Sequence, residues 1–385
     1  MAGGKADVAV IGAGPAGSSA ALELARRGFR VVLLEEHRQV GLPQHCAGML
    51  TKKACSRFGI RVPDGVVQAE PDRLLIGYGP LSLEARFELY ILDRAGFDQH
   101  LALGAVEAGA ELTTNSKVVG MRRSGGAWEL FIRGGRKLEA WLVVGADGYK
   151  AASVRWAGLP RPREAASCLQ YELEVGREVD MGLVACYFGS SVAPGGYAWV
   201  VPTGLRSVRV GLGVRGAPKP AKHYLDALVA REFPEARVVR RLAGLVSTGG
   251  PVRPSYSEAY LAVGEAAGQV NPLVGSGIAS AIACGRVAGR VAARALEEED
   301  LSSGRLSEYE RSWWALVGRN YELAMGVRRL LEQMPREELL DMASAASESL
   351  RKGRIGLAVL RLLAKRPSLL KYALRWGTLK EIAYF

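Results

Sequence analysis

The chain has 385 residues, of which 49% are hydrophobic and 23% are charged, and its formal net charge is +12. This length exceeds what one hydrophobic core usually serves, so we expect two domains, or one large domain with an appendage. The composition excludes a disordered or low-complexity chain, and the positive charge favours an anionic partner: a phosphorylated ligand, nucleic acid or an acidic lipid surface.

The first predicted elements are a strand, a glycine turn and a helix. Residues 7–11 form a short apolar run, and the alanines and leucines of "SSAALELARRG" then fall at helical spacing until Gly28. A second apolar run, "RVVLLEE", follows directly. A strand–helix–strand unit of this length predicts a parallel crossover.

The glycine turn of this unit has the Gly-x-Gly-x-x-Gly pattern of dinucleotide-binding proteins, at Gly12, Gly14 and Gly17. The first glycine permits a tight turn, the second lets the backbone approach a pyrophosphate, and the third lets the helix pack on the strand. A phosphate would lie at the helix N-terminus beside Ala16, where free amides and the helix dipole favour an anion. Glu35 ends the second strand, where it is placed to accept hydrogen bonds from ribose hydroxyls.

The rest of the chain alternates between helical and strand-like regions. We expect a helix over 94–109 and short strands over 111–144, with a glycine turn at 125–126. Aromatic and valine residues alternate from about 165 to 250, which predicts an antiparallel sheet. Residues 259–296 return to a strand, a loop and a long helix of small residues, and the remainder is expected to be helical.

Three further motifs separate the types of dinucleotide-binding protein. Arg94-x-x-Phe97-Asp98-x-x-Leu101 opens a predicted helix, "GADG" at 145–148 ends a buried strand, and "GEAAGQVNPLVGSGI" spans 264–278. Together and in this order they resemble the para-hydroxybenzoate-hydroxylase type of FAD-binding fold. The resemblance implies that the arginine meets the phosphates of FAD, that the Asp-Gly turn lies near the cofactor, and that the last motif holds the ribityl chain and the flavin ring.

The last motif also has a physical reason. A glycine loop that ends in a helix aims backbone amides at the pyrimidine side of the flavin, where negative charge gathers on reduction. Glu265 stands where the family usually has Asp, and its extra methylene affects the ribityl contact. The cofactor-binding residues implied by the resemblance are Gly12, Gly14, Ala16, Gly17, Glu35, Ala47, Gly48, Arg94, Val118, Asp147, Gly148, Glu265, Gly275, Gly277 and Ile278.

Within this fold, "PQHCAGM" and "YAWVVP" together resemble the geranylgeranyl reductase family, whose members hydrogenate isoprenoid chains. The family's Pro-x-x-Cys-Gly-Gly motif has Ala47 in place of one glycine, and its Tyr-x-Trp-x-Phe-Pro motif has a valine in place of the phenylalanine. The resemblance covers about residues 5–300. It implies Cys46 as the catalytic residue facing the flavin, and Tyr197, Trp199 and Pro202 as substrate-binding residues.

The resulting prediction is an FAD-dependent reductase that saturates isolated C=C bonds of geranylgeranyl chains in a membrane ether-lipid precursor. An isolated alkene has no carbonyl to accept negative charge, so direct hydride attack on it is unfavourable. We therefore expect the alkene to be protonated to a tertiary cation, which then accepts a hydride from the reduced flavin. A thiol is a weak acid for that step, so Cys46 either donates its proton late, acts with a flavin-bound partner, or positions the ring. A flavin-dependent monooxygenase or halogenase of the same fold, and a packing role for the thiol, remain alternatives.

The electron donor is left open between NAD(P)H and ferredoxin, because no second nucleotide fingerprint marks a site for bound NADPH. An electron-donor protein is therefore a candidate partner beside the isoprenoid lipid substrate. Five cysteines, at 46, 55, 168, 186 and 284, form no Cys-x-x-Cys pair, which argues against a disulfide framework, a zinc site or an iron–sulfur cluster. We expect no metal.

Residues 351–380 contain nine Lys and Arg residues and no acid, with leucines between the charges. This pattern is typical of a basic amphipathic helix at a membrane surface, and nucleic acid is not expected because phosphate binding does not need the leucines. We see no secretory signal at the N-terminus. Residues 266–285 carry no charge, but their Gly, Pro, Asn and Gln predict a loop rather than a membrane-spanning helix. We therefore expect a cytoplasmic protein that associates peripherally with the inner face of the cell membrane.

The predicted fold class is α/β, with three regions. The first is a Rossmann-type FAD-binding domain with a mixed sheet in three-layer packing, the second an antiparallel-sheet substrate domain, and the third a C-terminal helical, basic, membrane-facing region. Their predicted boundaries are 1–75 with 90–160 and 250–300 for the first, 76–89 with 161–249 for the second, and 301–385 for the third.

Overall fold

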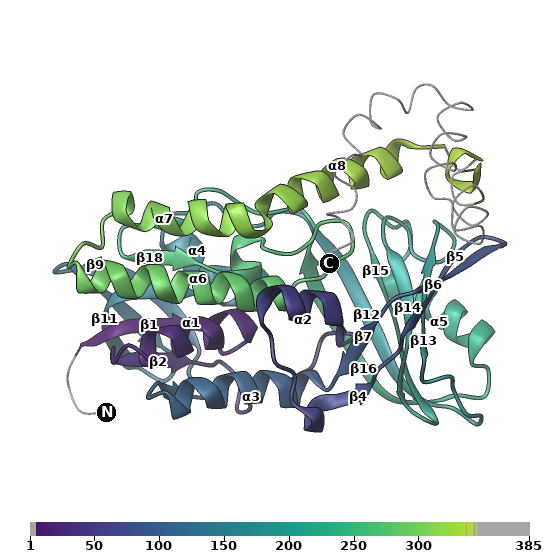
Figure 1. Ribbon diagram of the computed structural model, residues 1–385, viewed down its shortest axis with the longest axis horizontal. Helices are drawn as coiled ribbons and strands as arrows, with labels where there is room; N and C mark the ends of the chain where they lie inside the picture. Colours follow the sequence, from purple (N-terminus) through teal and green to yellow (C-terminus); the bar gives the residue numbers. More distant parts are fainter. Residues whose placement is uncertain (1–4, 336, 342–343, 345–385) are drawn as a thin grey trace.

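The computed structural model describes residues 5–335, 337–341 and 344. Figure 1 shows two large sheets side by side along the long axis of the molecule, with a layer of helices running over both. The first sheet contains the N-terminal strands, and the second contains the strands between residues 165 and 247. The predicted α/β class, with an antiparallel second sheet and C-terminal helices, is confirmed.

The first sheet is built around the predicted parallel crossover. Its strand order is β17-β18-β11-β1-β2-β8, with parallel pairing from β18 to β8, while β9 and β10 continue from β11 as an antiparallel meander. Its strands are β1 (Ala6–Ile11), β2 (Val31–Leu34), β8 (Glu111–Thr113), β9 (Val118–Ser124), β10 (Ala127–Ile132), β11 (Arg136–Gly145), β17 (Tyr256–Ser257) and β18 (Tyr260–Ala262).

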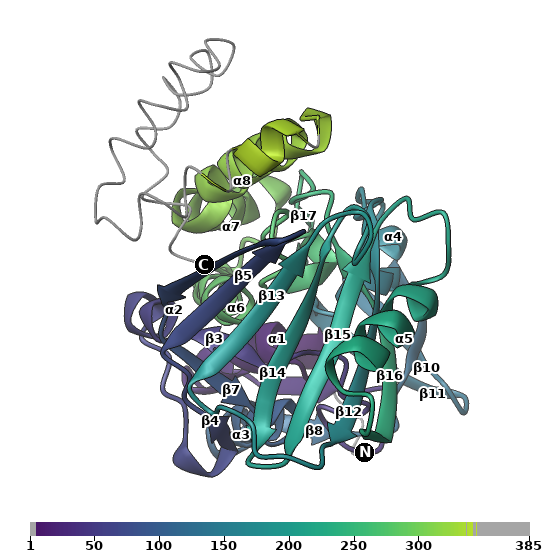
Figure 2. The same ribbon diagram turned by 90° about the vertical axis from the view of Figure 1, so that its right-hand side faces the viewer.

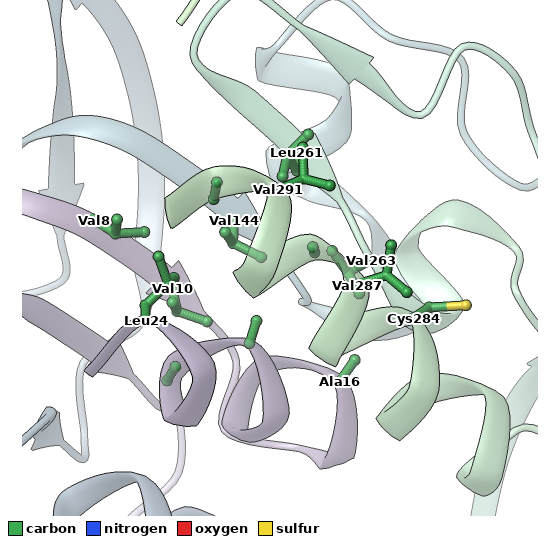
Figure 3. Close-up of a cluster of buried hydrophobic side chains, with 14 of the residues drawn as sticks. Val8, Val10, Ala16, Leu24, Val144, Leu261, Val263, Cys284, Val287 and Val291 are labelled. Carbon is green, nitrogen blue, oxygen red and sulfur yellow. The ribbon is translucent and has the colours of Figure 1, made fainter. Parts of the chain in front are cut away.

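Helices and meander cover opposite faces of this sheet, which gives the predicted three layers. Val8 and Val10 pack against α1 (Pro15–Ala25) and α6 (Ile278–Glu297), as Figure 3 shows, whereas Ala9 faces the meander. The alternation follows from the two-residue period of a strand. A Cβ on Gly285 of α6 would meet the carbonyl oxygen of Ala16, so this glycine permits the close approach of the two helices.

The second sheet has the order β16-β12-β15-β14-β13-β5-β6 and is antiparallel except for the β13–β5 pair, which is parallel. Helix α5 (Ala221–Glu232) covers one of its faces, as Figure 2 shows. Its strands are β5 (Arg73–Tyr78), β6 (Leu81–Arg86), β12 (Ala165–Glu174), β13 (Leu183–Phe188), β14 (Tyr197–Gly204), β15 (Ser207–Val214) and β16 (Arg237–Ser247).

Two features of this region differ from the strand-only expectation. Helix α5 (Ala221–Glu232) interrupts the strands, because Tyr224, Leu225 and Leu228 fall at helical spacing and pack on the sheet. Strand β5 joins the sheet with its whole length, so the predicted boundary between residues 75 and 76 falls inside a strand. The division into domains stays a prediction.

Shorter elements connect the two sheets and complete the helical layer. A small sheet of order β3-β7-β4 lies between them, and α7 and α8 are joined by a π-helical turn at Trp314–Gly318. No helix in the described ranges is long and apolar enough to cross a membrane, and the basic residues 351–380 lie outside those ranges. The other strands and α-helices are β3 (Met49–Thr51), β4 (Val67–Ala69), β7 (Leu89–Leu92), α2 (Lys52–Phe58), α3 (Arg94–Glu107), α4 (Ala152–Trp156), α7 (Ser303–Trp313) and α8 (Arg319–Gln333).

Candidate active site

The glycine turn after β1 has the geometry that a pyrophosphate needs. Gly12 adopts a φ of +101°, and a Cβ on Gly17 would meet the carbonyl oxygen of Gly12, so both positions require glycine. Gly14 is different, because nothing lies within 4 Å of the place where its Cβ would be. It caps α1 directly before Pro15, without a side chain to occupy the helix N-terminus. The turn therefore leaves an open cradle for an anion.

Glu35 closes the end of this turn. Its carboxylate accepts hydrogen bonds from the amide of Ala13 at 3.1 Å and from the amide of His37 at 2.9 Å, and the side chain is buried. The carboxylate is thus fixed against the glycine turn at the end of β2. This is the position expected for an acid that binds ribose hydroxyls.

The Asp-Gly turn after β11 is held by its own neighbours. Asp147 accepts from the amide of Ser153 at 2.8 Å and from its hydroxyl at 2.7 Å, and burial raises the pKa of Asp147. Gly148 has a φ of +67°, which allows the chain to turn sharply there. Val118 is buried at the start of β9, where it belongs to the cluster on the meander face of the first sheet. Their contacts with a cofactor stay predictions.

The loop before α6 combines an acid, glycines and a helix N-terminus. Glu265 is half-buried and accepts from the amide of Ser247 at 2.8 Å, and Gly277 caps α6, which begins at Ile278. Gly275 has a φ of +68°. The hydroxyl of Ser276 is buried and has no hydrogen-bond partner within the part of the chain that the structure describes. A buried donor without a partner beside glycines and a helix start fits a polar ligand such as the flavin ring.

Glu265→Gln is expected to stabilise the protein at neutral pH and not at acidic pH. Burial raises the pKa of Glu265 above its ordinary value, so the native state favours the protonated acid. The stability that protonation contributes is therefore present at low pH and is lost as the pH rises through the pKa of the native state. The amide mimics the neutral acid and still accepts from Ser247. Urea unfolding of the FAD-saturated proteins should show a gain of about 1 kcal/mol at pH 8 that shrinks towards pH 4.5. A gain independent of pH would contradict this reasoning.

Arg94 is the first residue of α3 and lies half-buried between an acid and a thiol. Its guanidinium forms an ion pair with Asp98 at 2.9 Å and also interacts with the Cys46 side chain. Burial opposes the charge, but the ion pair with Asp98 outweighs it and holds the pKa of Arg94 above its ordinary value. The arginine therefore stays charged beside Cys46. Its contact with the phosphates of FAD stays a prediction.

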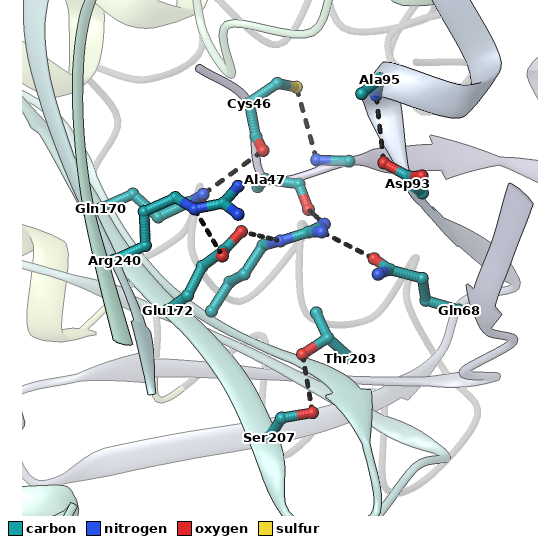
Figure 4. Close-up of polar contacts among 12 residues, drawn as sticks. Cys46, Ala47, Gln68, Asp93, Ala95, Gln170, Glu172, Thr203, Ser207 and Arg240 are labelled. Carbon is teal, nitrogen blue, oxygen red and sulfur yellow. Dashed lines mark hydrogen bonds and ion pairs between the residues drawn. The ribbon is translucent and has the colours of Figure 1, made fainter. Parts of the chain in front are cut away.

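The turn that carries Cys46 joins the two halves of the site. Its thiol is half-buried, accepts from the amide of Gly48 at 3.4 Å (Figure 4), and packs against a cluster that contains Leu50, Phe97 and Ile278. Gly48 has a φ of +83° and approaches the backbone of β7 so closely that a Cβ would lie 2.5 Å from the carbonyl oxygen of Leu92. A pocket next to the turn is lined by Met49, Leu50, Thr51, Ala54 and residues 276–280.

The second sheet presents an aromatic face towards this turn. Tyr197 and Trp199 share one face of β14, with ring centroids 5.8 Å apart, and Tyr197 also stacks on Phe188. The hydroxyl of Tyr197 donates to the carbonyl of Val274 at 2.7 Å, so it holds the loop before α6. The structure thus brings the predicted substrate residues Tyr197 and Trp199 to the predicted flavin loop. An apolar wall of this kind suits an isoprenoid chain.

Pro202 does not share this aromatic face. Side chains alternate along β14, so Pro202 falls on the side of Ala198 and Val200, which pack with α5. Trp199 and Val201 lie on the opposite side. The role of Pro202 in substrate binding stays a prediction.

Three residues of the site were missed in the sequence: Gln170, Arg209 and Gly211. The register of the second sheet places Gly211 between Gln170 on β12 and Trp199 on β14. Gln170, Gly211 and Trp199 therefore lie in one row across three neighbouring strands. Gln170 accepts from the indole of Trp199 at 3.0 Å and donates to the carbonyl of Cys46 at 3.4 Å. Arg209 lies two residues before Gly211 on β15, opposite Val201 and on the same face of the sheet. The Gly-x-Gly at 211 and 213, on a strand that otherwise alternates, was the available signal.

Gly211→Ala is expected to destabilise the protein by about 1–3 kcal/mol, because a Cβ would lie 2.5 Å from the rigid indole of Trp199. Urea unfolding measures the change, and Gly120→Ala on β9 is the matched control, since its Cβ would meet only Phe131 at 3.6 Å. Adding Trp199→Leu to Gly211→Ala should make the double variant less unstable than the sum of the single variants. Additive effects would show that the indole does not depend on this glycine.

Comparisons with known proteins agree with this geometry. Residues 164–246 match the geranylgeranyl reductase catalytic domain, and residues 7–54 match the FAD dependent oxidoreductase family. The chain is 34% identical over 384 residues to the digeranylgeranylglycerophospholipid reductase of Methanocaldococcus jannaschii, covering 95% of this chain and 97% of that protein. It is 36% identical to digeranylgeranylglycerophospholipid reductase 2 of Methanopyrus kandleri, covering 95% and 98%.

Solved structures give the same result for the fold. A geranylgeranyl bacteriochlorophyll reductase-like protein from Thermoplasma acidophilum superimposes with a TM-score of 0.86 and 27% identity, over 96% of this chain and 98% of the other. A flavin-dependent brominase superimposes with a TM-score of 0.71 and 17% identity, over 98% and 100%. At that identity the brominase shares the fold alone, so the predicted halogenase alternative gains no support from it.

Proposed function

The chain belongs to the geranylgeranyl reductase family of FAD-dependent oxidoreductases, and from this premise we propose that it saturates isolated C=C bonds in the geranylgeranyl chains of a membrane ether-lipid precursor. The observation that carries the proposal is the juxtaposition of the Cys46 turn with the apolar face of Tyr197 and Trp199, bridged through Gln170. The reductases named above act, by name, on digeranylgeranylglycerophospholipid. The open cradle at Gly14 and the loop at Gly275–Gly277 fit the binding of FAD.

The residues of the site have distinct roles in this proposal. Bound FAD, once reduced, supplies a hydride. Tyr197 and Trp199 bind the isoprenoid chain and exclude water, while Cys46 holds the proton on Sγ next to the charged Arg94. In each saturation the π bond breaks, one proton and one hydride form two C–H bonds, and two electrons leave the cofactor. An external donor, NAD(P)H or ferredoxin, must replace those electrons.

The test is a single turnover under anaerobic conditions. Protein reduced with dithionite and freed of excess reductant is mixed with geranylgeranyl lipids that carry a phosphate, a phospholipid head group or no head group. The expected result is flavin reoxidation together with a product that has gained two hydrogens per bond. A product that gains oxygen or halide in air, with no anaerobic reaction on any of the lipids, would contradict the reductase.

We also propose that residues 351–380 bring the enzyme to the membrane that contains its substrate. The proposal rests on the sequence alone, since this segment lies outside the described residues. Each of its nine basic side chains contributes about 1 kcal/mol near an anionic leaflet, and the leucines add a contribution that salt does not screen. Removal of the chain after residue 350 should leave FAD bound and abolish flotation with acidic liposomes. An insoluble truncated protein would show that the leucines pack on the enzyme instead.

A further inference from the structure

The turn that carries the thiol is fixed at three successive carbonyls. The carbonyl of Cys46 accepts from Gln170, that of Ala47 accepts from Arg209 at 3.2 Å, and that of Gly48 accepts from the amide of Leu92 at 2.9 Å. Figure 4 shows Cys46 and Ala47 facing the side chains that rise from the second sheet. The turn itself follows β2 in sequence. Two of its three contacts nevertheless come from residues of the second sheet that lie more than a hundred positions away along the chain.

Arg209 makes the central contact of this arrangement. The side chain is 3% exposed, and the same nitrogen that donates to Ala47 also donates to the carbonyl of Leu92 at 3.0 Å. Its other nitrogens donate to Gln68 at 2.7 Å and to Glu172 at 3.4 Å. One guanidinium therefore ties the thiol turn, β7 and β4 to the second sheet.

Burying this cation costs desolvation free energy, which only a good ion pair and well-placed hydrogen bonds offset. The nearest carboxylate, Glu172, is shared with Arg240, and the other three acceptors are neutral. A buried ion pair can often be replaced by apolar residues of similar volume without loss of stability. The arrangement is better explained by geometry, because the planar fork of an arginine fixes several acceptors at once.

We propose that Arg209 is a positioning residue for Cys46: by holding the carbonyls of Ala47 and Leu92 from the substrate-side sheet, it fixes the turn that aims the thiol. This inference rests on the proposed function, in which the Cys46 side chain acts at the reacting alkene. Gln170 completes the link, since the indole of Trp199 and the carbonyl of Cys46 bind the same amide. The residue that binds substrate and the residue that acts on it are thus held by one sheet face.

Arg209→Lys tests the proposal, because lysine keeps the charge but cannot bind all these acceptors together. Anaerobic single-turnover reoxidation by a geranylgeranyl lipid should slow about tenfold or more, with substrate affinity within about threefold of the wild-type value. Arg240→Lys is the matched control, since Arg240 pairs with the same Glu172 but is 53% exposed. Reoxidation in this control should match that of wild type.

A second readout does not need catalysis. The rate at which iodoacetamide alkylates Cys46, measured by peptide mass spectrometry, should rise about fivefold or more in Arg209→Lys, because loss of these bonds lets the turn open. Cys168, which is also half-buried and belongs to β12, provides the internal reference. If wild type reduces no isoprenoid but Cys46 alkylation still rises in the variant, the proposed function fails and the positioning role stands.

Unchanged reoxidation and unchanged alkylation in folded Arg209→Lys would overturn the proposal. If that variant does not fold or bind FAD, Arg209→Met provides the second test, because methionine fills the site without a buried charge. A folded, FAD-loaded Arg209→Met with slow reoxidation supports positioning. Failure of both variants to fold, or activity of Arg209→Met that falls only with its folded fraction, would show that the arginine is structural only.

Discussion

Gly14→Asp is expected to give a folded protein that no longer binds FAD. Nothing lies within 4 Å of the place where a Cβ on Gly14 would be, so we expect the substitution to leave the packing of α1 on β1 undisturbed. Aspartate is a favourable N-cap residue, so the helix should be retained or slightly stabilised. The same carboxylate, however, would occupy the helix N-terminus where the pyrophosphate must bind. We expect the affinity for FAD to fall about a hundredfold or more.

The measurement is the FAD content of the purified protein, together with its thermal unfolding in the absence of added cofactor. Gly14→Ala is the matched control: its methyl group fits the same open space without a charge, so it should retain FAD. Gly17→Ala should behave differently from both, because its Cβ would meet the carbonyl of Gly12 and the helix itself must shift. Wild-type FAD content in Gly14→Asp would contradict the assignment of this turn to the pyrophosphate.

The parts of the fold that were predicted correctly depend on short-range patterns. The strand, glycine turn and helix at residues 6–25 are encoded by neighbouring residues: β1 begins one residue before its predicted start, and α1 begins three residues before the predicted helix. The same is true of the strands that meet at the turn of residues 125–126. The helix α5 was missed because it is an isolated amphipathic segment inside a region dominated by strands.

The missed parts of the site depend on strand pairing, which a single sequence does not reveal. Arg209 lies 162 positions after Ala47, and only the register of β15 against β14 and β12 brings it beneath the thiol turn. The face to which Pro202 contributes has the same origin, because a motif gives the residues of a strand but not the face on which each side chain lies. The partner of β5 was likewise inaccessible, since a parallel pair between residues 73–78 and 183–188 has no local signal.

Cys46→Ala and Cys46→Ser separate a thiol that acts on substrate from a thiol that only packs. A half-buried packing thiol would leave a small void in the alanine variant, costing about 1 kcal/mol of stability, and activity per folded molecule would survive. If the thiol holds the proton for the alkene, both variants should lose isoprenoid reduction by about a hundredfold or more, the usual scale for a positioned proton donor. Serine still offers an oxygen to the amide of Gly48, so the turn should persist.

The decisive measurement compares anaerobic flavin reoxidation by a geranylgeranyl lipid in wild type and the two variants at equal FAD occupancy. Reduction of the flavin by dithionite should be unchanged, because it does not involve the thiol. Cys168→Ala is the matched control: Cys168 is half-buried and occupies the row of Tyr197 and Gly213 on the same sheet face, but it lies outside the turn. It should reoxidise at the wild-type rate. Equal rates in all four proteins would mean that Cys46 is a packing residue, and that the proton for the reaction comes from another group in the site.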